Sequence, residues 1–342
     1  MYNRELPEPP VTIAIPTLTA SPVLRECLFA LERQTCRDFE AVIIDNSGKG
    51  LVREMAATWS GVTVIENDQN KGFGTAVNQA FRKSKSAYCV TLNDDAIPDP
   101  GWLEALLHAM ESRPDAGMCA SAIRLAGATQ LDSAGMLISG DGTSKQRGNL
   151  QPPEAFAKPE EVLCPSGCAG LYRREMLDQI GMFDEDFFLY CEDTDLGLRG
   201  RWAGWTCLYA PDAGVEHRYS QTAGADSWVK AYYVERNRLF VLLKDFPIRL
   251  LARVPAASCS RYFWHLVSAL SGRGSAARFR EQSSNPAQLF YIVVRAHFVM
   301  LKHGPRLLRQ RWAIRRKARI GSRDFEQLVA RHFISPREVA AL

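Results

Sequence analysis

The stretch Cys89–Asp95, with the sequence CVTLNDD, decides the fold class predicted for this chain. Its apolar half, Cys89–Leu92, has the length and composition of a buried strand, and it ends in Asn93, Asp94 and Asp95. In an α/β sheet, ligands bind at the carboxyl ends of strands. Proteins commonly hold Mg²⁺ or Mn²⁺ through one or two carboxylates together with substrate phosphates. The stretch therefore suggests a metal-bound nucleotide, although turn chemistry alone favours an acidic strand cap without a ligand.

Apolar strands alternate with helical segments around this stretch. The first helix is predicted to start at Ser21-Pro22, because Pro suits the first helical position. The alternation indicates βαβ units, and hence an α/β fold with a mostly parallel sheet flanked by helices. The predicted strands are Val11–Ile15, Ala41–Ile44, Val62–Ile65 and Ser86–Leu92.

Polar residues follow three of these strands, at Pro16-Thr17, Asp45-Asn46 and Asn93–Asp95. Because parallel strands end at the same edge of a sheet, these ends are expected to outline one crevice. The glycines of Asn70–Gly74 do not form a GxGxxG motif after a first strand, and the chain has no GxxxxGK[ST] motif. A nucleotide must therefore be held in another way than by a dinucleotide fingerprint or a P-loop.

The chain beyond the crevice continues the α/β pattern with one long interruption. Residues 126–161 are rich in Gly, Pro and polar residues, which predicts a long loop with a hairpin around Asp141-Gly142. Loops of this length tend to be functional, so we expect a flexible wall over the crevice. The other predicted elements are a helix at Trp102–Met110, a strand at Ala116–Ile123, a small-residue segment at Cys164–Leu171, a helix at Arg173–Ile180 and a strand at Trp205–Tyr209.

A second group of acids lies in Phe187–Arg199, where Glu192, Asp193 and Asp195 follow aromatic residues at the start of a predicted helix. The helix dipole explains one acid at such a position, but not three. Acids in a partly apolar setting can be tuned as a general base.

His217 is the single histidine between residues 108 and 265. A lone histidine is more often structural than a ligand. A ligand role for His217 depends on its meeting Asp95 in space.

Charge divides the chain into two predicted domains. Residues 246–342 hold 18 Lys and Arg against 4 Asp and Glu, whereas residues 1–245 hold 24 against 34. We expect a catalytic domain over residues 1–245 and a basic, mainly helical extension over residues 246–342. The mixture of Arg, Lys, Leu and Trp in Arg306–Arg319 is typical of a helix that binds an anionic membrane surface, and a basic solvated face is the alternative.

Compartment and membrane topology follow from the cysteines and the apolar segments. Nine scattered cysteines indicate free thiols in a reducing cytosol. The N-terminus, MYNRELPEPP, lacks the features of a signal peptide. The apolar segments Leu289–Val294 and Ala296–Leu301 are too short to span a bilayer. We therefore expect a cytoplasmic protein, peripheral on the inner face of the membrane.

In order along residues 10–245, the motifs resemble the inverting family 2 glycosyltransferases of the GT-A fold, especially the bacterial branch with rhamnosyl- and galactofuranosyl-transferases. Each motif is weak alone, but the ordered set is specific. The motifs are IAIPT at Ile13–Thr17, VIIDNSG at Val42–Gly48, NKGFGTAVNQA at Asn70–Ala80, LNDDAIPDPGWLEAL at Leu92–Leu106, GMFDEDFFLYCEDTDLGLRGRWAGW at Gly181–Trp205, and YYVERNRL at Tyr232–Leu239.

The resemblance implies roles for the matching residues. Asn93–Asp95 matches the family's DxD motif, with Asp95 as metal ligand, Asp94 near the donor's ribose or phosphate, and Asn93 where many members have Asp. Glu192-Asp193 matches the motif that supplies the catalytic base, for which we favour Asp193. His217 matches a metal ligand of some relatives. The positions that match nucleotide-sugar contacts are Pro16, Thr17, Asp45, Asn70, Gly72 and Asn78.

The implied reaction moves a sugar, with inversion, from a nucleotide-diphosphate donor such as dTDP-rhamnose or a UDP-sugar. The acceptor is a saccharide or a lipid-linked saccharide in cell-surface polysaccharide synthesis, and the cofactor is Mg²⁺ or Mn²⁺. Asn93 leaves open an inactive sugar-nucleotide-binding relative. A nucleic-acid-binding protein is the third alternative, but the chain has no RRM, KH or helix-turn-helix pattern, and no nucleic-acid partner is expected.

Overall fold

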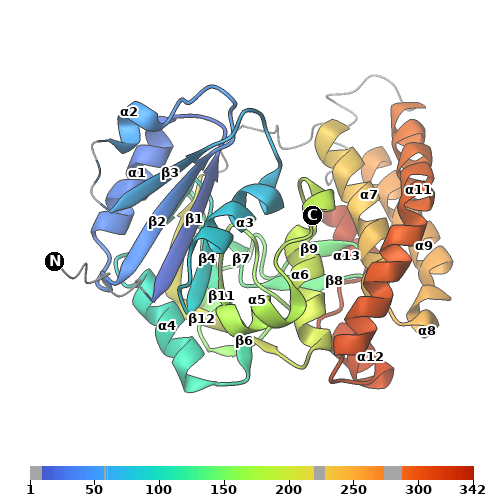
Figure 1. The fold of residues 1–342 in the computed structure, drawn as a ribbon. Helices are drawn as coiled ribbons and strands as arrows, with labels where there is room; N and C mark the ends of the chain where they lie inside the picture. Colours follow the sequence, from blue (N-terminus) through green and yellow to red (C-terminus); the bar gives the residue numbers. More distant parts are fainter. Residues whose placement is uncertain (1–9, 58, 60, 219–227, 273–286) are drawn as a thin grey trace.

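The computed structural model describes residues 10–57, 59, 61–218, 228–272 and 287–342. The first nine residues, which were part of the stretch used to predict that there is no signal peptide, lie outside this description. The described chain forms one large sheet flanked by helices, with a helical region beside it (Figure 1). The strand order is β10-β12-β6-β11-β4-β1-β2-β3, with β5 paired to β12 and β7 to β6.

The strands of this sheet run mostly in one direction. The bounds are β1 (Val11–Thr17), β2 (Phe39–Asp45), β3 (Val62–Glu66), β4 (Tyr88–Leu92), β5 (Ala96–Pro98), β6 (Ala116–Leu125), β7 (Leu131–Ser133), β10 (Glu160–Glu161), β11 (Ala169–Arg173) and β12 (Thr206–His217). Strands β1 to β4 are parallel neighbours, and β6 pairs in parallel with β12. Strand β11 lies antiparallel between β4 and β6. The predicted mostly parallel sheet is therefore confirmed, but β11 was missed because its small residues carry no strand pattern of their own.

Helices cover both faces of the sheet. Apolar residues of α1 (Pro22–Glu32), α2 (Arg53–Ala56) and α4 (Trp102–Ser112) pack on one face, whereas α3 (Phe73–Lys83), α5 (Arg174–Ile180) and α6 (Glu192–Trp202) pack on the other. Helix α1 begins where the sequence predicted, since the Ser21 hydroxyl accepts a hydrogen bond from the Leu24 amide at 3.3 Å.

The region predicted as one long loop contains several short elements, so that prediction was wrong. They are β7, β8 (Met136–Ile138), β9 (Ser144–Gln146), a 3₁₀ turn η1 (Pro153–Phe156) and β10. The predicted hairpin is confirmed as the β8–β9 pair, with Gly142 at φ +80° in its turn. The tip is fixed by a buried ion pair, in which Arg261 Nε lies 2.5 Å from Asp141 Oδ2. This contact argues against a flexible wall.

The predicted helical extension is also confirmed. It comprises α8 (Ile248–Leu251), α9 (Val254–Leu270), α11 (Ala287–Lys317), α12 (Ser322–Arg331) and α13 (Pro336–Ala341), next to α7 (Trp228–Asp245). Helix α11 packs along α7, and α13 packs on α9. In the described residues, no helix combines the length and apolarity needed to cross a bilayer. The domain division after residue 245 stays a prediction.

Candidate active site

The three polar strand ends meet at one edge of the sheet. Thr17 and Asp45 are register partners at the ends of β1 and β2, with Pro16 opposite Ile44. The Thr17 hydroxyl donates to Asp94 Oδ2 at 2.5 Å, which joins the end of β1 to the residues after β4. Burial raises the pKa of Asp94 to about 6, although the Thr17 hydrogen bond opposes this rise. The strand ends therefore meet at one edge as predicted, whereas the crevice itself stays a prediction.

Asp45 shapes the loop that follows its strand. Its buried carboxylate accepts hydrogen bonds from the backbone amides of Ser47, at 2.9 Å, and Val52, at 3.1 Å. The next residue, Asn46, donates to Asn70 Oδ1 at 3.0 Å and accepts from the Lys71 amide at 3.0 Å. Asn46 was not among the predicted site residues, yet it joins the end of β2 to the loop before α3.

Gly72 makes a contact that a larger residue would block. Its φ is +84°, and a Cβ atom at this position would lie 2.4 Å from the carbonyl oxygen of Phe188. The amide of Phe73 donates to the same oxygen at 2.7 Å. The loop predicted to lie along the nucleotide is therefore bound directly to the segment before the acidic pair.

Asn78, unlike Thr17 and Asp45, lies away from the strand ends and contacts the loop before the acidic helix. Its side chain is fully buried and bonds both backbone polar groups of Phe183, with Nδ2 2.9 Å from the carbonyl oxygen and Oδ1 3.1 Å from the amide. The same Nδ2 donates to Glu185 at 3.0 Å. Asn78 therefore holds the loop before the acidic helix, and its amide does not face the strand ends.

Asp95 and His217 meet in space, as the ligand hypothesis required. Strand β12 continues past the predicted end at Tyr209 to His217, which pairs with Ala96 in β5. This register brings His217 Nε2 to 3.3 Å from Asp95 Oδ1. On its other side, His217 Nδ1 lies 2.9 Å from Asp132 Oδ2.

His217 therefore links two buried carboxylates. Burial lowers the pKa of His217, but Cys168 and the hydrogen bonds to Asp132 and Asp95 outweigh this effect and raise the pKa above its usual range. Asp132 was missed by the sequence reasoning, because it lies in the region predicted as a loop. A carboxylate on the far ring nitrogen is the usual partner of a metal-binding histidine.

The chemistry of this donor set fits a divalent cation that also takes ligands from a diphosphate. The separation of 3.3 Å between Asp95 Oδ1 and His217 Nε2 suits two adjacent ligands of one ion, since each bonds at about 2.0–2.2 Å. Within the described ranges, no group of three or more His, Cys, Asp or Glu side chains is placed to hold a metal ion by itself. The remaining ligands would therefore have to come from substrate and water.

The acidic pair lies at the amino end of α6, with unlike surroundings for its two members. Asp193 accepts hydrogen bonds from the Gly167 amide at 3.0 Å and from the Thr194 amide at 2.6 Å. Burial raises the pKa of Asp193, and these hydrogen bonds oppose the rise. Glu192 is buried, and its Oε2 has no hydrogen-bond partner among the described residues. Burial and the neighbouring charges of Asp193 and Asp195 raise the pKa of Glu192 to about 8.

One short segment joins the residues after β4 to the acidic pair. The Gly167 amide binds Asp193, while the next carbonyl, that of Cys168, accepts from the Asn93 amide at 2.8 Å. A Cβ atom on Gly167 would touch both Phe73, at 3.5 Å, and Asp193, at 3.6 Å. The small residues of this segment thus allow the donor loop and the acidic helix to approach each other.

The turn before the acidic pair has an unusual backbone. Phe188, Tyr190 and Cys191 have φ values of +62°, +68° and +65°, a region that non-glycine residues rarely occupy. Asn237, buried in α7, donates to the carbonyl oxygens of this turn. Asn237 was not named as a site residue, although the YYVERNRL motif that contains it was a visible signal.

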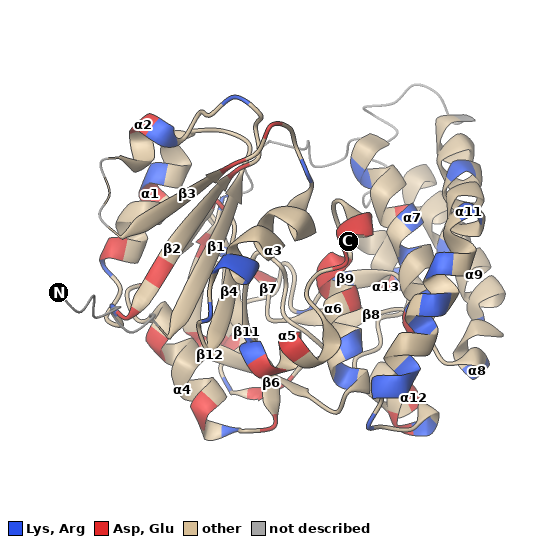
Figure 2. Ribbon diagram, in the orientation of Figure 1, with Lys and Arg blue, Asp and Glu red and all other residues tan. Residues whose placement is uncertain are grey.

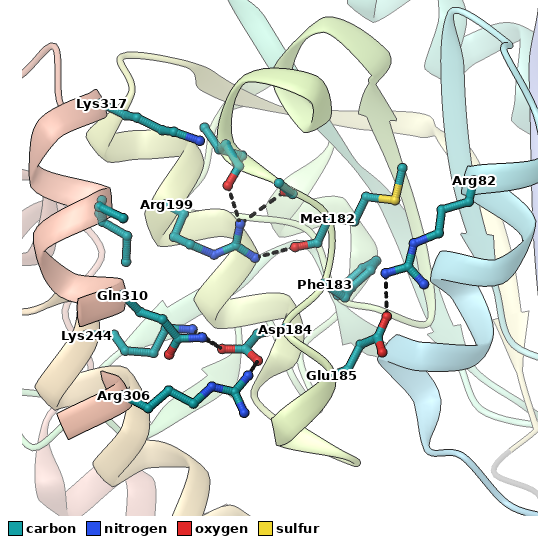
Figure 3. A pocket seen from close by; sticks show the side chains of 14 residues that line it. Arg82, Met182, Phe183, Asp184, Glu185, Arg199, Lys244, Arg306, Gln310 and Lys317 are labelled. Carbon is teal, nitrogen blue, oxygen red and sulfur yellow. Dashed lines mark hydrogen bonds and ion pairs between the residues drawn. The ribbon is translucent and has the colours of Figure 1, made fainter. Parts of the chain in front are cut away.

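A cavity of about 340 Å³ lies between the loop 180–185 and α11, away from the sheet edge (Figure 3). Lys244 Nζ and Gln310 Nε2 approach Asp184 at 2.5 and 2.9 Å, while Arg82 pairs with Glu185 at 2.6 Å. These charges largely satisfy one another. The cavity therefore marks the junction through which the extension supports the loop bound by Asn78.

Comparison with known proteins shows the family of this chain. The model described as "Glycosyl transferase family 2" matches residues 12–181. An N-acetylglucosaminyl-diphospho-decaprenol L-rhamnosyltransferase of Mycobacterium tuberculosis is 31% identical over 235 residues, which cover 61% of this chain and 76% of that protein. The O-antigen chain rhamnosyltransferase WbaN of Salmonella anatum is 23% identical and covers 63% of this chain and 68% of that protein.

Solved structures agree on the fold. GalNAc-T7 with UDP, GalNAc and Mn²⁺ has a TM-score of 0.60 at 17% identity, over 76% of this chain and 52% of that chain. The mannosyltransferase PcManGT from Pyrobaculum calidifontis, with GDP-Man and Mn²⁺, has a TM-score of 0.51 at 17% identity, over 92% of this chain and 87% of that chain. The fold is therefore the predicted GT-A fold, and this chain belongs to glycosyl transferase family 2, as a hexosyltransferase.

Proposed function

We propose that this chain transfers rhamnose, with inversion, from dTDP-rhamnose to a lipid-linked saccharide during synthesis of a cell-surface polysaccharide. A UDP-sugar is the alternative donor. The observation that carries the proposal is the Asp95–His217 contact, at 3.3 Å, beside the Thr17–Asp94 hydrogen bond at the same sheet edge. The two relatives described as rhamnosyltransferases support the choice of sugar.

The acidic pair provides the base. At neutral pH, Glu192 with its pKa of about 8 retains a proton, whereas two backbone amides donate to Asp193 and so favour its charged form, which makes Asp193 the better base. Asp193 removes the proton of the acceptor hydroxyl, and the resulting oxygen attacks the anomeric carbon from the face opposite the nucleotide. The amides of Gly167 and Thr194 fix the orientation of this carboxylate.

The donor lies along the sheet edge. Thr17, Asp94 and the loop Asn70–Gly72 bind the nucleoside and its phosphates, and Asp95 with His217 would hold Mg²⁺ or Mn²⁺. The ion would neutralise the departing nucleoside diphosphate. Asp132, through its hydrogen bond to Nδ1, keeps Nε2 of His217 directed toward Asp95.

A lipid-linked acceptor implies that the protein works at a membrane. The Mycobacterium tuberculosis relative is described as acting on N-acetylglucosaminyl-diphospho-decaprenol, a lipid-linked sugar. By analogy, we expect this chain to act in the cytoplasm as a peripheral protein on the inner membrane face.

The test is nucleotide release by the purified protein with Mn²⁺ and an N-acetylglucosaminyl-diphospho-lipid acceptor. We expect dTDP release from dTDP-rhamnose, dependent on acceptor, and loss of this release in Asp193→Asn and Asp95→Asn. If a UDP-sugar is turned over and dTDP-rhamnose is not, the donor is the UDP-sugar. Undiminished turnover in both variants would overturn the site assignment.

A further inference from the structure

One side of α11 carries a continuous row of exposed apolar side chains. Phe298, Leu301 and Trp312 are 67%, 68% and 63% exposed. The opposite side, with Leu307 and Ile314, is buried against the rest of the protein. Successive members of the exposed apolar row lie three, four or, between Leu301 and Leu308, seven residues apart, so the row follows one face of the helix. Its members are Tyr291, Val294, Phe298, Leu301, Leu308 and Trp312.

A row of cations runs beside this apolar row. Arg295, Lys302, Arg309 and Arg316 are spaced seven residues apart, or about two helical turns, so they lie along one line of the helix. All four are exposed, and none forms an ion pair with a carboxylate of the described residues, although the Arg295 guanidinium lies over the Tyr232 ring of α7, at 4.5 Å from its centre. Helix α11 contains no Asp or Glu (Figure 2). We call the apolar row and the cation row together the outer face of α11.

Arg306 shows that this arrangement is not a general property of the helix. It lies off the cation row, and it pairs with Asp184 and Asp186 of the catalytic region. The cations of α11 that face the protein thus have partners there: Arg306 pairs with carboxylates, whereas Arg311 and Arg315 donate to backbone carbonyl oxygens of the segment 243–246.

Helix α9 adds a second apolar row. Phe263, Leu266 and Leu270 are 58%, 59% and 72% exposed and again recur at helical spacing. The other side of α9 is bound to the protein, because the buried Arg261 pairs with Glu235 at 2.8 Å. Helix α9 also lacks Asp and Glu.

We propose that the outer face of α11, together with the apolar row of α9, docks on an anionic phospholipid surface. Apolar side chains next to cations match the acyl boundary and the headgroups of such a surface. A second copy of the chain is disfavoured as the occupant, because a symmetric contact would place the cation row against itself. The biological reason for this docking rests on the proposed function, because a lipid-linked acceptor lies in a membrane.

The proposed docking face extends beyond the predicted segment Arg306–Arg319 toward the amino end of α11. Within Arg306–Arg319, Leu307 and Ile314 are buried, whereas Leu308 and Trp312 are exposed. The exposed apolar residues of α11 begin well before this segment, at Leu289 and Phe290.

The test is flotation of the full chain with vesicles of phosphatidylcholine, with and without phosphatidylglycerol. We expect binding only to the anionic vesicles, and a decrease in high salt. Lys302→Glu/Arg309→Glu should weaken binding at least about tenfold, from a contribution of about 1 kcal/mol per basic residue near the surface. The control, Arg25→Glu/Arg33→Glu, makes the same charge change at exposed residues of α1 and just after it. Its binding should fall far less.

Phe298→Ser/Leu301→Ser tests the apolar row, and thermal unfolding checks that each variant is folded. Equal flotation of the Lys302/Arg309 variant and its control would overturn the proposal. So would a wild-type dimer in light scattering that does not float and that these substitutions dissociate. Vesicle binding is measured without any sugar, so a protein that floats but transfers no sugar would overturn the proposed function and leave this inference standing.

Discussion

The side-chain nitrogen of Asn237 lies 2.6 Å from the carbonyl oxygen of Tyr190, two residues before the acidic pair. The same nitrogen donates to Leu189 at 2.8 Å and to Phe187 at 2.9 Å. Residues held at positive φ, such as Tyr190, cost about 1–3 kcal/mol each and persist only where the surroundings enforce them. The position of Glu192 and Asp193 thus depends on an amide in α7.

Asn237→Ala should lower kcat at least about tenfold, because loss of these hydrogen bonds frees the turn and displaces the base. The KM for the donor should change little. The control is Gln34→Ala, which removes another buried amide, bonded to the Asp99 carbonyl at 2.8 Å. Steady-state kinetics with thermal unfolding checks this. If both variants lose stability and kcat in parallel, Asn237 supports the fold rather than the base.

Asp193→Asn and Glu192→Gln should have opposite outcomes. Loss of a general base costs about 10²–10⁴-fold in rate, which we expect for Asp193→Asn. Glu192→Gln should keep kcat within a few-fold at neutral pH, because Gln resembles the protonated acid that a pKa of about 8 implies. Single-turnover rates with saturating donor measure both. If Glu192→Gln is inactive and Asp193→Asn is active, Glu192 is the general base and Asp193 is not.

The pH dependence of Glu192→Gln provides a separate check. In the wild type, the folded-state pKa of Glu192 is raised from 4.5 to about 8. The unfolded chain therefore loses this proton at lower pH, and the free energy of unfolding falls as pH rises between these two values. Glu192→Gln should remove this fall, so that its Tm exceeds that of the wild type above about pH 8. Parallel Tm curves for the two proteins across this range would contradict the burial of the carboxyl group.

Asp132→Asn tests the partner of His217. Substitution of such a partner typically costs 10–100-fold in metal affinity, so the Mn²⁺ concentration for half-maximal activity should rise by about this factor. Titration of activity with Mn²⁺ measures it. The same half-saturation in both proteins would mean that His217 is structural.

Lys244→Met tests the junction of the extension with the catalytic region. Lys244 is buried and lies 2.5 Å from Asp184, so its removal leaves this carboxylate with only the more distant Arg306, at 3.6 Å, as a cation partner among the described residues. Breaking a buried pair in this way costs about 3–5 kcal/mol of unfolding free energy. Urea unfolding measures it, with Lys83→Met as an exposed control that should stay within about 0.5 kcal/mol. A small effect of Lys244→Met would show that the junction contributes little.

The sequence alone determined the sheet class, the crevice edge and the two acidic groups. These features depend on local patterns: apolar runs mark strands, helical spacing marks helices, and polar residues at parallel strand ends must meet at one edge. For the same reason the sequence pattern is sufficient to assign Thr17, Asp45 and Asp94 to that edge, and the ordered motifs are sufficient to identify the family.

The tertiary structure decided the rest, because those features depend on pairings between distant residues. Strand β11 is a strand only because β4 and β6 supply its hydrogen bonds on both sides. The bulged β12 carries His217 to Ala96 and so to Asp95, while Asp132 arrives from a region without a clear pattern. Periodicity in one segment reports which residues share a face, but not which distant residue a face will meet.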